Sequence, residues 1–286
     1  MQIVSASRRT DIPAHYPEWF MGRVREGLAG YRNPFSGAEH EVSLRPEDVR
    51  CFVFWSKNFE PFEPHLKELE ERGYNFYFLF TITGLPRVFE ERVPPPESAL
   101  RSFSRLSERY GPKRTVWRFD PIVLSNLTPK EERLETFLGL CRELEGKTER
   151  CIVSFPTMYG KVRRNLDELR ERKGVEVYLP SEEERREFAR ELAQAAAASG
   201  ISLLACCSDY LVGGPVGKAS CVDGKLIDEL FPDHGTSFKP LPTRRECGCT
   251  ESRDIGAYDS CSHGCWYCYA NQRPGGPLRS GSGLFL

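Results

Sequence analysis

The sequence predicts an α/β protein, built as a complete or partial (β/α) barrel of the TIM type with a C-terminal cysteine-rich metal-cluster region. Short apolar runs alternate with amphipathic runs from residue 2 to residue 205, which indicates strands alternating with helices and therefore a parallel sheet. The apolar runs are rich in β-branched and aromatic residues, as buried parallel strands are. No glycine-rich nucleotide-binding fingerprint follows the first run, which disfavours a nucleotide-binding Rossmann domain.

The elements follow from this alternation. Strands are expected at 2–6, 51–55, 75–82, 115–119, 151–155 and 201–205, with a seventh at 254–258. Apolar residues at helical spacing predict helices at 16–29, 64–72, 97–110, 130–146 and 181–199. The last helix opens with a capping box, Ser181 with Glu184. We expect the barrel to span residues 1–230 and the cysteine-rich segment, packed on the barrel, to span residues 231–286.

Composition limits the function classes. The chain has 286 residues, a net charge of −1 and a pI near 6.6. This balance argues against nucleic acid or a membrane surface as a partner. The chain starts with a strand-like run rather than a signal peptide, and it has no apolar run of transmembrane length. We therefore expect a cytoplasmic protein whose cysteines are thiols or metal ligands rather than disulfides.

Three cysteines near the end carry the strongest functional indication. Cys261, Cys265 and Cys268 have C-x3-C-x2-C spacing, and Gly264 lets the loop fold back because glycine tolerates a positive φ. Three converging sulfurs suit an iron–sulfur cluster. A four-iron cluster held by three thiolates keeps one iron open, and open sites do chemistry. The alternative is structural zinc, which takes four N/S ligands and has His263 nearby.

The spacing, with an aromatic residue just before the last cysteine, resembles the cluster motif of radical S-adenosylmethionine (SAM) enzymes. The resemblance implies a [4Fe–4S] cluster on the three loop thiolates, SAM on the open iron, and a reductant such as ferredoxin or flavodoxin. The reduced cluster would cleave SAM to a 5′-deoxyadenosyl radical.

A wider pattern resembles one family more specifically. Residues 247–258, leading into Cys261, together with residues 5–13, resemble an uncharacterised bacterial family, domain of unknown function 1848. That family carries a radical-SAM-like cysteine cluster at its C-terminus. Radical SAM enzymes usually have the motif near the N-terminus, so their usual core order would have to be permuted here.

Polar residues at the predicted strand ends form the expected ligand pocket, because βα loops converge at that end of a barrel. The side chains expected to act in catalysis are Arg8, Asp11, Lys57, Arg118 and Asp120. Those expected to contact the cofactor are Ser7, Arg9, Thr83 and Tyr267. The cations suit a carboxylate or phosphate, so we expect an anionic small-molecule substrate. The alternative is that these charges form ion pairs on the barrel rim or are solvated in loops.

Five further cysteines allow a second metal site. The family resemblance assigns Cys207, Cys221, Cys247 and Cys249 to it, with Cys206 as an extra. Four thiolates can close around a second iron–sulfur cluster or a zinc ion. Alternatively they stay free, or one of them completes the first cluster.

The main hypothesis is thus a radical SAM-type enzyme. Two rivals remain open. One is an electron-transfer or redox-sensing protein with fully ligated clusters, and the other is a zinc-stabilised binding module.

Overall fold

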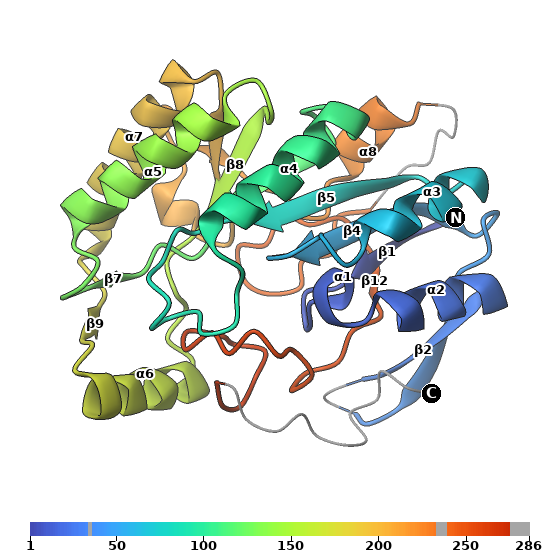
Figure 1. Ribbon diagram of the computed structural model, residues 1–286, viewed down its shortest axis with the longest axis horizontal. Helices are drawn as coiled ribbons and strands as arrows, with labels where there is room; N and C mark the ends of the chain where they lie inside the picture. The colour runs from blue at the N-terminus through green and yellow to red at the C-terminus, as the bar shows by residue number, and fades with distance from the viewer. Residues whose placement is uncertain (34–35, 233–238, 275–286) are drawn as a thin grey trace.

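The core of the protein is an eight-stranded parallel sheet (Figure 1). The structure is a computed structural model, and it describes residues 1–33, 36–232 and 239–274. The strands in chain order are β1 (Gln2–Ala6), β4 (Val49–Ser56), β5 (Phe76–Thr81), β6 (Thr115–Phe119), β8 (Arg150–Val153), β10 (Ser202–Ala205), β11 (Gly217–Lys218) and β12 (Arg253–Asp254). Their order in space is β12-β1-β4-β5-β6-β8-β10-β11, with every neighbouring pair parallel.

The strand order is wound in one direction, as it is in a (β/α) barrel. From β1 onward each strand is added to the same edge, and β12 then returns to lie beside β1. The expected α/β fold with a parallel sheet is therefore confirmed. Among the described strands, β11 and β12 form the two ends and do not pair, so no closed barrel is seen.

The expected helices are present with shifted ends. They are α2 (Pro17–Glu26), α3 (Leu66–Glu71) after the 3₁₀ turn η1 (Glu63–His65), α4 (Pro96–Tyr110), α5 (Lys130–Leu144) and α7 (Glu182–Ala198). Several elements were not predicted: α1 (Ile12–His15), α6 (Gly160–Lys173), η2 (Asp209–Leu211), α8 (Gly224–Leu230), the hairpin β2 (Leu28–Arg32) and β3 (Glu39–Ser43), and the pair β7 (Leu124–Ser125) and β9 (Val177–Tyr178). No helix in the described ranges is both long and apolar enough to cross a bilayer.

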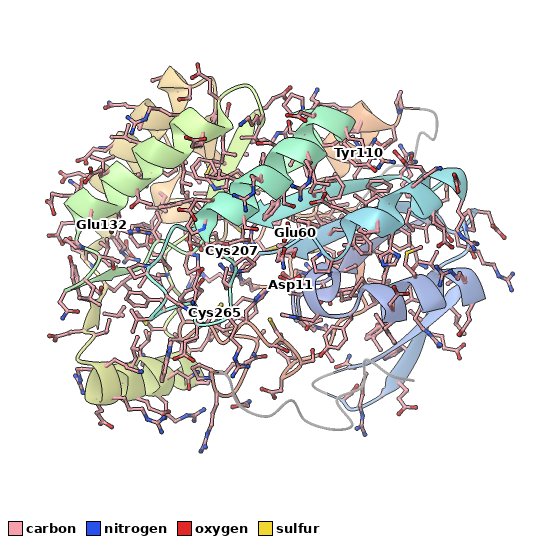
Figure 2. The ribbon with its side chains drawn as sticks, in the orientation of Figure 1. Asp11, Glu60, Tyr110, Glu132, Cys207 and Cys265 are labelled. Carbon is pink, nitrogen blue, oxygen red and sulfur yellow. The ribbon has the colours of Figure 1, made fainter. Side chains whose placement is uncertain are left out.

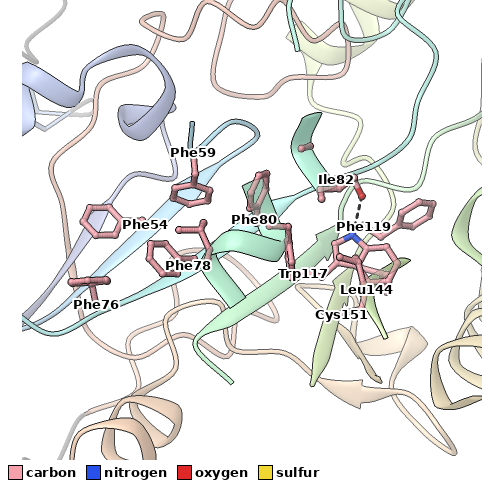
Figure 3. Close-up of a cluster of buried hydrophobic side chains, with 14 of the residues drawn as sticks. Phe54, Phe59, Phe76, Phe78, Phe80, Ile82, Trp117, Phe119, Leu144 and Cys151 are labelled. Carbon is pink, nitrogen blue, oxygen red and sulfur yellow. Dashed lines mark hydrogen bonds between the residues drawn. The ribbon is translucent and has the colours of Figure 1, made fainter. Parts of the chain in front are cut away.

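One face of the sheet packs against the helices. Alternate residues of the strands point to this face because side chains of a strand alternate. They include Phe54, Phe78 and Phe80, which pack with aromatic residues of neighbouring elements (Figure 3). Trp117 also lies there, and its Nε1 donates a hydrogen bond to the carbonyl of Ile82 at 3.0 Å. This aromatic layer is the main hydrophobic core.

The other face packs against the C-terminal half of the chain. Val53, Tyr77 and Leu79 point to this face, and residues 219–227 and the cysteines at 247 and 249 cover it. The described part of the predicted cysteine-rich segment, residues 239–274, also supplies β12. That segment therefore both completes the edge of the sheet and covers its inner face.

Candidate functional site

The cysteine loop, residues 261–268, folds against the carboxyl ends of β1, β4 and β5. It follows β12 directly in the chain, and β12 pairs with β1. The backbone N–H of Trp266 donates to the carbonyl of Phe89 at 3.0 Å, and Glu90 forms a β-bridge with Cys265. Gly264 has a φ of +71°, which confirms the predicted reversal of the chain. The last cysteines of the chain thus lie beside its first strands.

Asp11 fastens this loop to the end of β1. The carboxylate is buried and contacts the His263 Nε2 at 2.7 Å, while Ser56 Oγ donates to it at 2.7 Å and the Lys57 N–H at 2.8 Å. It also caps α1 by accepting from the Ala14 N–H at 3.0 Å. Burial acts to raise the pKa of Asp11, but the charge and hydrogen bond of His263 outweigh it, so the pKa lies below its ordinary value. Both oxygens are occupied, which gives Asp11 a positioning role.

Glu90 fastens the loop a second time. Lys57 Nζ donates to its Oε1 at 2.9 Å, Thr83 Oγ1 donates at 2.8 Å, and the Tyr267 hydroxyl donates to the same oxygen. All four side chains are largely buried. Sequence reasoning singled out Lys57, Thr83 and Tyr267 but missed Glu90, the carboxylate on which they converge. The sequence marked Glu90 only as an acidic residue in the segment after β5, which is too common a feature to predict a site.

The three loop thiols are close enough to affect one another electrostatically. Burial raises the pKa of Cys261, Cys265 and Cys268, and the neighbouring thiols add to the rise for Cys261 and Cys265. Lys57 works in the opposite direction on Cys265 and Cys268 because its charge favours a thiolate. One buried and two partly buried thiols beside a cation are a suitable donor set for a metal, which displaces the protons on binding.

Arg8 and Ser7 meet β12 at a third attachment. The Arg8 Nε lies 3.3 Å from the Asp254 Oδ2, and Ser7 Oγ donates to the Asp254 Oδ1 at 2.8 Å. Arg9 Nη1 contacts the carbonyl of Gly256 at 3.4 Å. An added Cβ on Gly256 would lie 1.9 Å from Ser7 Oγ, so only glycine fits at that position. The expected cofactor contacts Ser7 and Arg9 therefore also join the end of β1 to β12 and to Gly256, just before the cysteine loop.

Arg118, in β6, and Asp120, just after that strand, form an ion pair. Ser154 Oγ also donates to Asp120, and the Arg118 guanidinium lies over the Trp55 ring at 4.9 Å. Arg118 is close enough to Lys57 and to Cys206 for their charges to interact. It thus lies between the cysteine loop and the second group of thiols.

The second group contains five thiols rather than four. Cys207, Cys221, Cys247 and Cys249 come together as expected, and Cys206 lies among them. Figure 2 labels one thiol from each group, Cys207 and Cys265, together with Asp11. Arg244, which the sequence did not single out, lies close enough to Cys207 to interact with it electrostatically.

A third arrangement involves two histidines. Ligand atoms of His15, Cys261 and His263 all lie within 4.8 Å of one another. The buried Nε2 of His15 and Nδ1 of His263 have no hydrogen-bond partner in the described part of the chain. Because His263 Nε2 contacts Asp11, its Nδ1 is oriented as in a metal-binding histidine backed by a carboxylate.

One of three comparisons with known proteins identifies the family. A family model described as "Domain of unknown function (DUF1848)" matches residues 3–270. The chain belongs to this family. No curated protein and no solved structure matches the chain. Any activity of this DUF1848 protein must therefore be argued from the site itself.

Proposed function

We propose that this DUF1848 protein is an iron–sulfur enzyme of the radical SAM type. In this proposal Cys261, Cys265 and Cys268 hold a [4Fe–4S] cluster, and SAM binds at the iron that has no protein ligand. The observation that carries the proposal is the position of the cysteine loop at the carboxyl ends of the parallel strands. In barrel-type α/β proteins chemistry gathers at that end.

The strand order supports the proposal by accounting for the late motif. Radical SAM enzymes usually carry the motif near the N-terminus, whereas here it follows β12, close to the end of the chain. However, β12 lies next to β1 at the edge of a sheet wound in one direction. The loop therefore follows the strand that lies beside β1 at the edge of the sheet, which is where a motif near the N-terminus would also lie. A permuted chain order is compatible with an unpermuted arrangement of strands.

The residues present fit the cluster. Three thiols on one loop, of which Cys265 is buried and the other two are partly buried, supply its ligands, and Lys57 supplies a positive charge close to two of them. When bound and reduced, the cluster would supply the electron that cleaves SAM. The chain's own contribution is to bind and orient. Asp11 holds the loop through His263, and Glu90 holds it through Tyr267. Thr83 also donates a hydrogen bond to Glu90.

The substrate is proposed to be a small anion. Arg8, Lys57 and Arg118 each have a carboxylate partner, so their charges are partly compensated. Arg8 Nη1 and Arg118 Nε are nevertheless buried without a hydrogen-bond partner in the described residues. These N–H groups are donors that a carboxylate or phosphate would satisfy. We further propose a cytoplasmic location, where thiols stay reduced and a ferredoxin or flavodoxin could donate the electron.

The test is SAM cleavage by anaerobically reconstituted, reduced protein. We expect 5′-deoxyadenosine from the wild type and none from the triple variant Cys261→Ala, Cys265→Ala, Cys268→Ala. Cys141→Ala is the matched control, because Cys141 is a buried thiol in α5, away from both thiol groups, and it should keep the activity. A wild type that holds iron and sulfide but forms no 5′-deoxyadenosine contradicts the proposal.

A second candidate function rests on the His15, Cys261 and His263 group. If a histidine completes the site, no position is left for SAM. The protein would then be an electron-transfer or redox-sensing protein, or a zinc-stabilised module. In that case His263→Ala lowers the metal content, and the wild type neither binds nor cleaves SAM. Under the first proposal, the iron content survives His263→Ala.

A further inference from the structure

Five thiols form a closed ring on the inner face of the sheet, apart from the cysteine loop. The sulfur of Cys206 lies 3.4 Å from that of Cys221 and 3.7 Å from that of Cys207. Cys207 and Cys247, Cys247 and Cys249, and Cys249 and Cys221 are also close enough to influence one another electrostatically. The thiols come from three separate segments: the end of β10, the turn after β11, and the stretch before β12.

The backbone holds these segments tightly together. The Tyr77 hydroxyl, from the inner face of β5, donates to the carbonyl of Cys221 at 2.6 Å. Ser220 Oγ donates to the carbonyl of Gly248 at 2.7 Å. An added Cβ on Gly248 would lie 2.8 Å from the carbonyl oxygen of Ala219, so the C-x-C turn needs glycine here.

Cys207 adds a sign of constraint. Its φ is +49°, in the left-handed region that non-glycine residues seldom adopt. Such conformations persist only where the surroundings enforce them, and they cluster at functional sites. In this case the conformation places the Cys207 sulfur in the ring.

Two arginines lie beside the ring. Arg118 interacts electrostatically with Cys206 and Cys221, and Arg244 interacts electrostatically with Cys207. Neutral thiols that only fill space need no adjacent guanidinium groups, whereas a buried anionic centre does.

The distances between the ring sulfurs distinguish a single zinc ion from a larger metal cluster. A lone tetrahedral zinc with Zn–S bonds of about 2.3 Å needs all its sulfurs about 3.8 Å apart. Among the described residues, the ligand atoms of His15, Cys261 and His263 all lie within 4.8 Å of one another. No set of three ring sulfurs meets this criterion, so at least one sulfur pair in any such set is more than 4.8 Å apart. Neighbouring sulfurs are close, but those across the ring are farther apart, which suits a group larger than one ion.

We propose that Cys207, Cys221, Cys247 and Cys249 hold a second iron–sulfur cluster, with Cys206 as a spare thiol. The family resemblance marks Cys206 as the extra thiol, which leaves four thiolates, the number that an iron–sulfur cluster binds. This centre is independent of the proposed SAM chemistry at the cysteine loop.

The experiment is iron and sulfide quantification on anaerobically purified full-length protein. The loop triple variant Cys261→Ala, Cys265→Ala, Cys268→Ala should retain iron and sulfide in equal amounts. The ring variant Cys221→Ala, Cys249→Ala should lose that amount relative to the wild type, while Cys206→Ala should lose none. Cys151→Ala, which removes an isolated buried thiol from β8, serves as the matched control.

The outcomes separate the two proposals. The proposal of a second cluster is contradicted if the loop variant contains no iron. It is also contradicted if the loop variant contains one zinc ion per chain and the ring variant contains none. Loss of iron in Cys206→Ala contradicts the assignment of Cys206 as the spare thiol. Circular dichroism checks the fold of the ring variant, and 5′-deoxyadenosine formation by the wild type reports separately on the loop. A spectrum of the reduced loop variant by electron paramagnetic resonance (EPR) provides a second readout that does not need the ring variant to fold.

Discussion

Three buried carboxylates fasten the cysteine loop and β12 to the sheet. Asp11 holds His263, Glu90 holds Tyr267 and Lys57, and Asp254 holds Ser7 and Arg8. Each carboxylate has several donors, because a buried charge without partners is costly. Removing one member of such a pair leaves the other charge buried and unpaired, which is strongly destabilising.

Glu90→Gln should therefore destabilise the protein by about 3 kcal/mol, because it leaves the buried Lys57 ammonium without its counter-charge. Urea unfolding of the two proteins at equal metal content measures the difference. Glu71→Gln is the control, since Glu71 forms an exposed pair with Lys67 on α3 and should change the free energy of unfolding by less than about 0.5 kcal/mol. Equal effects of the two substitutions would show that the Glu90 pair does not support the loop.

The residues of the site were only partly predictable. Arg8, Asp11, Lys57 and Thr83 stand directly after apolar runs, so the strand pattern placed them at one end of the sheet. Glu90 and Arg244 lie in irregular segments without a periodic pattern, and His15 is the last residue of α1, a turn of helix that was not predicted. Their importance depends on neighbours far along the chain, and a single sequence does not record those contacts.

Individual elements follow local chemistry closely where a cap or a glycine marks their ends. The Ser181 capping box predicted the start of α7, and the structure confirms it. The predicted helix over 16–29 ends earlier, at Glu26, because Gly27 adopts a φ of +74° and terminates α2. The two-residue strands β7, β9 and β11 are too short to show a period, so the sequence pattern could not reveal them.

Ser181→Ala should destabilise α7, and with it the protein, by about 1 kcal/mol, because the Glu184 backbone N–H loses its capping acceptor. Thermal or urea unfolding measures the change. Ser199→Ala, at the other end of the same helix, is the control and should have an effect below about 0.5 kcal/mol. If both variants unfold together with the wild type, the cap does not limit stability.

At the scale of the whole molecule, the return of β12 to β1 decides where the chemistry lies. The parallel sheet was predictable from alternating strands and helices, but the pairing of the last strand with the first was not. That pairing involves residues about 250 positions apart, Val4 with Arg253 and Ser5 with Asp254. It brings the cysteine loop to the strand ends where the predicted pocket residues lie. A late motif thereby reaches the position of an early one.

The central claim is that the loop thiolates hold a cluster with one iron open to SAM. The most direct measurement is the EPR spectrum of the reduced protein with and without SAM, compared with that of the loop triple variant. We expect SAM to shift the cluster signal of the wild type and to leave any remaining signal of the variant unchanged. A wild-type signal that arises from the loop cluster but does not respond to SAM would contradict the account, because it would mean that a fourth side chain completes the site.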